Sequence, residues 1–405
     1  MISYEDALAA VLKSVATLKP VQVETEAALG LVLARPVKAG LRMPRHDQSA
    51  MDGIAVRVED VTGASEDNPV TLRLIDEIPA GSARRPALRE GTAIKVFTGS
   101  GVPNNTGGIV IVEDCRFDGD QVEVCASAHP GGHIRRAGEE VRRGDLIAAE
   151  GTRLTPPVVG LLTLFGVDRV RVFPAPRVGV ITMGDELAAP GTRLGAAQIY
   201  DSNGPALRAA LRAMGIETIH SWRVGDQPTE LMRAFRESIR KCDVVISCGG
   251  ASVGDHDHVA EARAHVRIED LFTRVAIKPG KPNVFGLAPK GVPVFSLPGN
   301  PVSALVSFRQ IVRPGLMKMM GQALEQETEV AVATVGRARK PGRLEWLRGK
   351  LAHVNGRREV SAVDAQGSHM LTGLANADVL MEIPPDSEGI EAGDELVVRR
   401  LGWFG

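Results

Sequence analysis

The sequence predicts a multidomain chain in which a doubly wound α/β domain is joined to a β-rich lobe, a connector and a C-terminal β-barrel. Three observations predict it. The chain has 405 residues, more than one hydrophobic core usually supports. Between residues 176 and 326, apolar strands alternate with helical patterns, which is typical of a parallel sheet covered on both faces. On either side of this region, short strands are separated by turn residues.

Composition limits the kind of ligand. The chain has 48 Lys and Arg against 49 Asp and Glu, for a formal charge of -1. No global positive field attracts nucleic acid, and the 4% of aromatic residues disfavours base stacking. The longest apolar stretch, residues 158–167, is about half of what a bilayer requires. We expect no nucleic acid and no membrane, and any anionic ligand must be held by a local site.

The cysteines and the first residues indicate a cytoplasmic protein. The four cysteines form no C-x-x-C pair, which disfavours a zinc knuckle or a redox dithiol. The first residues lack the basic region of an export signal. Ser3 and Asp6 instead form a capping-box pattern that predicts a helix over residues 4–18.

The first half of the chain is predicted to contain the β-rich lobe. Residues 49–133 have short strands with turn signals such as Asp118-Gly119. Residues 146–172 have the apolar periodicity of a helix-containing connector. The Pro-Ala-Pro segment at 174–176 then marks a boundary.

The α/β region has clear element signals. Its strands are predicted at residues 177–182, 216–222, 243–248 and 292–297. Its helices are predicted at residues 205–214, 226–241 with Asp226 as N-cap, and 301–320. Beyond residue 327, turns at Asn355-Gly356 and Glu388-Gly389 separate the strands of the predicted barrel.

Two glycine-containing loops follow strands of this sheet. In open α/β sheets, ligands bind outside the carboxyl ends of the strands. The loop at residues 249–257 matches neither a dinucleotide motif nor a P-loop, and a tight turn without ligand explains it equally well. In the loop at residues 298–303, Asn300 is a natural N-cap and Pro301 suits the first helical position. Free N–H groups there suit an oxyanion, although a capped helix without ligand is an equal alternative.

Two lysines lie between these loops on a turn stiffened by proline and glycine. Lys278 and Lys281 belong to the segment Lys-Pro-Gly-Lys-Pro at 278–282. Their limited conformational freedom favours phosphate binding over simple solvation.

Acidic residues in the same region suggest a magnesium site. Glu186 follows the first strand of the sheet, and Asp201 precedes a helix. Carboxylates at such ends hold Mg²⁺ beside phosphates, although Asp201 is equally explained as a capping residue. His256 and His258 alternate with Asp255 and Asp257, but a helix start is expected there, so we favour a structural role for the histidines.

Seven motifs, in this order, resemble one family, the MoeA proteins and the E-domain of gephyrin. The resemblance runs from near residue 45 to Gly367-Ser368-His369. The motifs are Asp47-Gln48-Ser49-Ala50-Met51-Asp52-Gly53, Thr98-Gly99-Ser100, Ile134-Arg135-Arg136-Ala137-Gly138-Glu139-Glu140, Gly184-Asp185-Glu186-Leu187, Ser247-Cys248-Gly249-Gly250-Ala251-Ser252-Val253-Gly254-Asp255, Lys278-Pro279-Gly280-Lys281-Pro282 and Pro298-Gly299-Asn300-Pro301-Val302-Ser303.

The resemblance implies a four-part subunit. It consists of a discontinuous elongated domain (1–48 and 134–175), a β-rich lobe (49–133), a molybdopterin-binding α/β domain (176–326) and a C-terminal β-barrel domain (327–405). The resemblance also implies a homodimer whose active site lies between the α/β domain of one subunit and the β-rich lobe of the other.

The reaction implied is the Mg²⁺-dependent insertion of molybdenum from molybdate into adenylated molybdopterin, with release of AMP. By the resemblance and the loop patterns, catalysis is assigned to Asp52, Thr98, Arg135, Glu140, Glu186 and Asp257. Binding of the pterin substrate is assigned to Asp201, Ser247, Gly249, Gly250, Ser252, Lys278, Lys281, Pro298, Gly299, Asn300 and Ser303. The metal is assigned to Glu186, Asp201 and Asp257.

A molybdopterin adenylyltransferase is the expected partner. Two alternatives stay open at this point. One is insertion of tungsten, because the two oxyanions are nearly equal in size and charge. The other is a molybdopterin-binding or scaffold protein that retained the fold and lost the activity.

Overall fold

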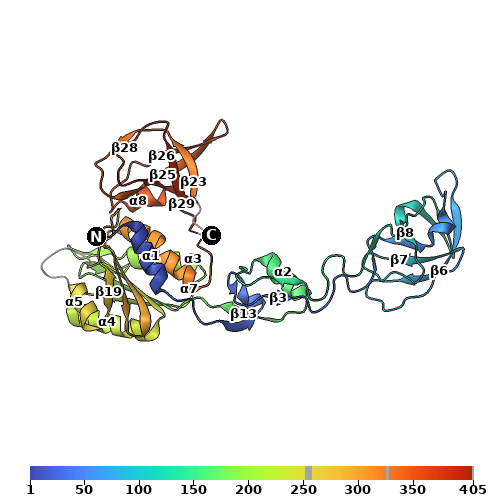
Figure 1. Ribbon diagram of the computed structural model, residues 1–405, viewed down its shortest axis with the longest axis horizontal. Coiled ribbons are helices and arrows are strands. Elements are labelled where there is room, and N and C mark those ends of the chain that lie inside the picture. Colours follow the sequence, from blue (N-terminus) through green and yellow to red (C-terminus); the bar gives the residue numbers. More distant parts are fainter. Residues whose placement is uncertain (251–257, 325–327, 404–405) are drawn as a thin grey trace. The chain divides into compact units, whose positions relative to one another are not determined.

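A computed structural model describes residues 1–250, 258–324 and 328–403 (Figure 1). The chain divides into two compact units. The first comprises residues 1–34, 151–155 and 169–405, and the second comprises residues 35–150 and 156–168.

The first unit contains a six-stranded mixed sheet. Its order is β17 (Ile219–Val224), β14 (Val178–Met183), β18 (Val244–Cys248), β22 (Val292–Leu297), β21 (Val284–Ala288) and β19 (Glu269–Phe272). The first four strands are parallel, as predicted. The other two run antiparallel to their neighbours and were not predicted. Every residue of β14 and β18 is buried, which explains their continuous apolar sequences.

Helices cover both faces of this sheet, which confirms the doubly wound fold (Figure 1). One face packs against α1 (Tyr4–Ser14), α3 (Asn203–Ala213), α6 (Pro301–Ser307) and α7 (Arg313–Met319). The other face packs against α4 (Pro228–Lys241) and α5 (His258–His265). Valines and isoleucines alternate between the two cores along each strand.

Three helix predictions need correction. The first helix begins after Ser3, whose hydroxyl accepts a bond from the N–H of Asp6 at 3.0 Å as predicted, but it ends at Ser14. Asp226 does not cap α4, because Gln227 is the N-cap and the carboxylate of Asp226 accepts instead from the N–H of Asp185 at 3.4 Å. The predicted helix over 301–320 is interrupted.

The interruption is a π-helical turn, Phe308–Val312, between α6 and α7. Pro314 has no N–H, so the carbonyl of Gln310 has no i+4 donor. The hydroxyl of Tyr4 donates to that carbonyl at 3.4 Å. The π-helical turn therefore follows from Pro314, and Tyr4 of α1 supplies the hydrogen bond that the carbonyl of Gln310 would otherwise lack.

The C-terminal region is a closed five-stranded barrel, as predicted. Its strands are β25 (Leu344–Val354), β26 (Arg357–Ala362), β23 (Thr328–Ala333), β29 (Glu395–Arg400) and β27 (Val379–Ile383), and β27 pairs again with β25. The predicted turn at Asn355-Gly356 joins β25 to β26, with φ of 51° and 79° at its two residues. Trp346 of β25 is fully buried and meets Tyr4 edge to face, with ring centroids 4.9 Å apart.

Smaller elements complete the first unit. They are β1 (Val21–Glu24), β2 (Val32–Leu33), β13 (Arg169–Phe173), β15 (Leu187–Ala188), β16 (Ile199–Tyr200), β20 (Ile277–Lys278), β24 (Arg337–Ala338), β28 (Gly389–Ile390) and α8 (Leu371–Ala375). Strand β13 lies between β1 and β2, while β20 pairs in parallel with β25. The turn predicted at Glu388-Gly389 lies instead at residues 385–386, and Gly389 is the first residue of β28, which pairs with β24.

The second unit is built on another six-stranded sheet. Its order is β8 (Gly108–Ile111), β5 (Gly53–Val56), β7 (Thr92–Val96), β6 (Val70–Ile78), β10 (Gln121–Val124) and β9 (Cys115–Asp118). The predicted Asp118-Gly119 turn joins β9 to β10, with φ of 59° at Gly119. Two short ladders, β4 (Gln48–Ser49) with β11 (Ile134–Arg135) and β3 (Val37–Lys38) with β12 (Leu146–Ala148), and helix α2 (Pro156–Leu164) belong to the same unit.

Within the described ranges, no helix is both long enough and apolar enough to cross a membrane.

Candidate functional site

Gly249 and Gly250, which begin the first predicted glycine loop, lie beside the second loop at the carboxyl edge of the first unit's sheet. The N–H of Gly249 donates to the carbonyl of Leu297 at 3.3 Å. A Cβ on Gly299 would lie 3.6 Å from the Cα of Gly249. Gly249 has φ of 107°, and a Cβ there would lie 2.5 Å from the carbonyl oxygen of Met183. Glycine therefore allows the loops after β14, β18 and β22 to meet.

The start of α6 is partly covered by the barrel domain. Asn300 occupies the N-cap position with extended backbone angles, but its side chain makes no capping bond. Its amide donates instead to the hydroxyl of Ser368 at 3.1 Å, and the N–H of Val302 donates to the carbonyl of Ser368 at 3.1 Å. One of the helix N–H groups predicted to be free is thus already used. The side chain of Ser303 is buried in the first turn.

Asp201 links the loop after β14 to the start of α3. One carboxylate oxygen accepts from the hydroxyl of Thr182 at 2.9 Å, and the other accepts from the N–H of Gly204 at 2.9 Å. The side chain is buried, with 6% of Asp201 exposed. The capping role that the sequence left open is therefore present. Asn203, two residues on, donates to the carbonyl of Gly299 at 2.7 Å and joins this loop to the next.

Glu186 is exposed in the loop after β14. Its carboxylate folds back over Gly184, where a Cβ would lie 2.5 Å from Oε2 of Glu186. With φ of 146° and no side chain, Gly184 leaves room for this arrangement. An exposed carboxylate is available to a cation without the loss of an internal hydrogen bond.

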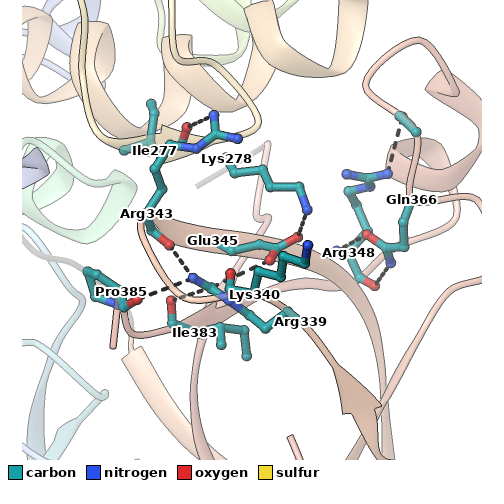
Figure 2. A network of polar contacts seen from close by, with 11 residues as sticks. Ile277, Lys278, Arg339, Lys340, Arg343, Glu345, Arg348, Gln366, Ile383 and Pro385 are labelled. Atoms are coloured by element: carbon teal, nitrogen blue, oxygen red, sulfur yellow. Dashed lines mark hydrogen bonds and ion pairs between the residues drawn. The ribbon is translucent and has the colours of Figure 1, made fainter. Parts of the chain in front are cut away.

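The two lysines of the predicted turn have different environments. Nζ of Lys278 lies 2.9 Å from Oε1 of Glu345 on β25, because β20 pairs with β25 and places the two residues opposite each other (Figure 2). The other oxygen of Glu345 lies 3.5 Å from Arg339. Glu345 is 5% exposed. Lys281 is exposed, and no ion pair to it is recorded within the described part of the chain.

Two residues at the end of β18 point into the protein. The hydroxyl of Ser247 donates to Ser296 at 2.7 Å and is fully buried, so it lies inside the sheet and not at its edge. Burial raises the pKa of the Cys248 thiol to about 12, and this thiol donates to the carbonyl of Pro298 at 3.2 Å. Cys248 is therefore a protonated structural residue at neutral pH. Ser252 and Asp257 lie outside the described residues.

In the second unit, Asp52 and Thr98 form a tight pair. One oxygen of Asp52 accepts from the N–H of Thr98 at 2.7 Å and from its hydroxyl at 2.8 Å. The hydrogen bond from the N–H, followed by that from the hydroxyl, lowers the pKa of Asp52. The carboxylate is charged and exposed.

The short ladder of β4 with β11 brings Arg135 to the same region. Ile134 pairs with Ser49, whose carbonyl also accepts from the N–H of Gly99 at 2.9 Å. Arg135 is exposed next to this pairing. Glu140 lies further on, where its N–H donates to the carbonyl of Met43 at 3.2 Å, and it is exposed.

The ladder is fixed by Asp47, a residue to which no role was assigned from the sequence. Partial burial opposes its ionisation, but hydrogen bonds from the N–H of Ala137 and from Arg136, both at 2.8 Å, outweigh burial and lower the pKa of Asp47. Its motif position was visible in the sequence, but its partners come from 90 residues away and were not.

Within the described residues, no three His, Cys, Asp or Glu side chains converge into a group that could hold a metal. The predicted residues fall into two sets, one at the carboxyl edge of the α/β sheet and one around β4.

Comparisons with known proteins agree with the motif pattern. A model of the MoeA N-terminal region (domain I and II) matches residues 2–166, a probable molybdopterin binding domain matches residues 179–318, and the MoeA C-terminal region (domain IV) matches residues 330–401.

Similar relatives cover nearly the whole chain. A molybdopterin molybdenumtransferase 2 of Mycobacterium tuberculosis is 39% identical over 95% of both chains. A molybdopterin molybdenumtransferase of a Nostoc species is 34% identical over 94% of this chain and 88% of its own. The crystal structure of a molybdopterin biosynthesis MoeA protein from Pyrococcus horikoshii OT3 superposes with a TM-score of 0.80 at 28% identity, covering 99% of this chain and all of that one. This chain belongs to the MoeA family of molybdopterin molybdenumtransferases.

Proposed function

We propose that this protein acts in molybdenum cofactor biosynthesis, where it transfers molybdenum from molybdate to adenylated molybdopterin and releases AMP. The observation that carries the proposal is the meeting of three strand-end loops at one sheet edge, in a domain whose lysine turn leaves Lys281 exposed. Two relatives named as molybdopterin molybdenumtransferases, at 39% and 34% identity, support the same reaction. They give no support to loss of activity or to a preference for tungsten.

The α/β domain is proposed to hold the phosphates and the pterin. Lys281 supplies a positive charge with no ion-pair partner among the described residues, whereas Lys278 is held in place by Glu345. Gly249, Gly250 and Gly299 allow a ligand to approach the backbone closely. Pro298, Asn300, Ser303, Ser247 and Ser252 complete the proposed binding set. Of these, Ser247 acts from within the sheet, through the shape of the loop that follows it.

Magnesium is proposed as the divalent cation. Mg²⁺ usually takes one or two carboxylates together with substrate phosphates, so a prebuilt cluster of three acids is not required. The exposed carboxylate of Glu186 fits this pattern. Asp201 fits it if a lone pair remains beside its bonds to Thr182 and Gly204, and Asp257 is the third proposed ligand. When bound, the cation would neutralise phosphate charge.

The β-rich lobe is proposed to complete the site. Asp52, oriented by Thr98, is a permanently charged base or water-positioning group near neutral pH, and Arg135 and Glu140 are proposed to act with it. We propose that these residues serve the α/β domain of a second copy, in a homodimer of four-part subunits with the boundaries 1–48 with 134–175, 49–133, 176–326 and 327–405.

Two further proposals concern the setting. Adenylated molybdopterin carries a phosphoanhydride bond that is activated for transfer, so we propose direct supply by a molybdopterin adenylyltransferase. All four cysteines are free thiols, which fits a reducing compartment, and we propose the cytoplasm.

The test is reconstitution of purified protein with adenylated molybdopterin, Mg²⁺ and either molybdate or tungstate. We expect AMP release to depend on molybdate, with molybdenum in the pterin product by elemental analysis. Equal incorporation of tungsten from tungstate would contradict a preference for molybdenum and would indicate a transferase that accepts either oxyanion. If the protein binds the pterin but releases no AMP with either oxyanion, it is a binding protein and not an enzyme.

A further inference from the structure

A second cavity lies at the opposite edge of the α/β sheet from the proposed active site. It has a volume of about 1010 Å³. Residues at the amino ends of three parallel strands line it, including Arg177 before β14, Asp243 before β18 and Val292 at the start of β22. The rest of the wall comes from α4, the end of α5, the β21–β22 turn and the segment after α1. It is large enough for a small-molecule ligand.

The lining is strongly basic. Six of its 19 residues are lysine or arginine and one is acidic, although the whole chain has 48 basic and 49 acidic residues. The six are Lys19, Arg177, Arg236, Arg240, Arg267 and Lys290. Asp243 is bonded to Arg177, with Nη2 to Oδ1 at 2.8 Å. For the other five cations, no ion pair is recorded within the described residues.

Helix ends explain only part of this charge. Helices α1, α4, α5 and α7 all finish at this edge, and each C-terminus carries roughly half a negative charge. Together they balance about two of the five uncompensated cations, so about three positive charges remain. Arg236 and Arg240 are also one helical turn apart on α4, where like charges repel. The cavity therefore has an excess positive charge that an anion would relieve.

Two of the cations occupy backbone positions that favour glycine. Arg267 follows α5 with φ of 61°, and the N–H of Ile268 donates back to the carbonyl of Arg263. The equivalent position after α3 is Gly215, with φ of 78° and the same bonding pattern. Lys290 has φ of 67° in the turn between β21 and β22. At each of these two positions, a left-handed backbone conformation is less favourable for a residue with a side chain than for glycine. That arginine and lysine are nevertheless found there, at the rim of one cavity, indicates a role for the side chains themselves.

We propose that this basic cavity binds a compact, multiply charged phosphate compound, such as a pyrophosphate or triphosphate group, separately from the active site. No Phe, Tyr or Trp is among the described residues that line the cavity, so recognition rests on charge and not on base stacking. A nucleotide would be held by its phosphates.

The test is titration calorimetry with inorganic pyrophosphate. Arg236→Ala and Arg240→Ala are each expected to weaken binding by about 10-fold, the value of one charged contact. Arg233→Ala is the matched control, since Arg233 lies on the same helix and does not line the cavity. Lys281→Ala should leave this affinity unchanged. Binding that is lost in Lys281→Ala and kept in the α4 variants would assign pyrophosphate to the active-site edge and overturn the proposal.

A second measurement separates binding from folding. Arg267→Gly removes a cation and also relieves its left-handed backbone, so the melting temperature should stay the same or rise while pyrophosphate affinity falls. A structural role alone would change stability without changing affinity. Affinity should increase from AMP to pyrophosphate to triphosphate. The proposal would be contradicted if AMP and triphosphate bound with equal affinity, or if none of the three compounds bound, because the site is proposed to recognise phosphate charge.

Discussion

Lys278 and Lys281 are three residues apart in one rigid turn, yet their electrostatic surroundings differ. Lys278 is paired with a buried carboxylate from the barrel, whereas Lys281 is exposed. A ligand phosphate must compete with Glu345 for Lys278. At Lys281, no carboxylate among the described residues forms a competing ion pair. Lys281 therefore has the larger free charge to offer an incoming anion.

Removal of Lys281 should weaken binding of adenylated molybdopterin. A charged contact is worth about 1.5–3 kcal/mol, so Lys281→Ala should reduce affinity roughly 10- to 150-fold, and Lys281→Arg should recover part of it. Calorimetry at two salt concentrations should show a shallower salt dependence in the alanine variant. Lys13→Ala, an exposed lysine on α1, is the control. Unchanged affinity in Lys281→Ala would remove this lysine from the site.

Glu345→Gln should lower both stability and substrate affinity. The change leaves Arg339, whose side chain is 8% exposed, without its anionic partner, so we expect a loss of about 1–3 kcal/mol in urea unfolding. Lys278 also loses the contact that positions it. Glu395→Gln, on an exposed barrel position, is the control. Wild-type values for both measurements would mean that Glu345 has no part in holding the lysine.

Thr98→Val should raise the pKa of Asp52 toward its ordinary value of 3.8. The folded pKa is depressed, so the stabilising effect of this pair is present above pH 3.8 and is lost as pH falls through the folded pKa. The acid-unfolding curves of wild type and variant should therefore differ near neutral pH and converge in strong acid. NMR titration of the carboxyl carbon measures the pKa directly, with Thr62→Val as control. An unaltered Asp52 titration would contradict the assigned hydrogen bond.

At the level of elements, the sequence predicted those features that depend on neighbours in the chain. The buried strands β14, β18 and β22 were found because continuous apolar runs are rare outside sheet interiors. The turn at Asn355-Gly356 was found because few residues adopt two left-handed conformations in succession. The two antiparallel strands at the sheet edge were missed because their sequences alternate weakly.

Features that depend on distant partners could not be predicted. Asp226 has the right residue type for a cap, but its carboxylate accepts from the N–H of Asp185, which lies 41 residues earlier. Nothing in the sequence around Glu345 distinguishes it from other strand residues. Its role follows from the ladder of β20 with β25, which places it opposite Lys278. The candidate site was therefore predictable as a set of loops and charges. The internal bonds of Asp201, Asn300 and Lys278 were not.

Asp201 offers a test of a helix cap and a metal ligand at one position. Asp201→Asn keeps an oxygen for the N–H of Gly204, so stability should change by less than about 1 kcal/mol, whereas Asp201→Ala should lose about 1 kcal/mol or more. An amide is a poorer ligand for Mg²⁺, so the asparagine variant should need more Mg²⁺ for half-maximal AMP release. An unchanged Mg²⁺ requirement would leave Asp201 with the cap alone.

At the scale of the whole molecule, the proposed site residues belong to two compact units. Lys281 and Glu186 belong to one unit, and Asp52, Thr98 and Arg135 belong to the other. A site shared between subunits requires a symmetric dimer, since each copy then supplies one half of two identical sites.

Complementation between inactive variants should reveal such sharing. A heterodimer of Lys281→Ala with Asp52→Asn would contain one intact site if the halves come from different subunits, and none if both come from the same chain. We expect mixing to restore activity, up to about half of wild type per heterodimer. Light scattering should show dimers in each preparation. No recovery in verified heterodimers, or a fully active monomer, would reject the shared site.

The ladder between β20 and β25 forms late during synthesis of the chain. Lys278 leaves the ribosome well before Glu345, and the strand that will align it, β25, emerges about 70 residues later. Until then, residues 274–276 can pair with Ile2, but Lys278 lacks the strand and the carboxylate that position it. A nascent chain halted before residue 344 would carry a nearly complete α/β domain with Lys278 unpaired, so the lysine turn would reach its final form only after β25 is made.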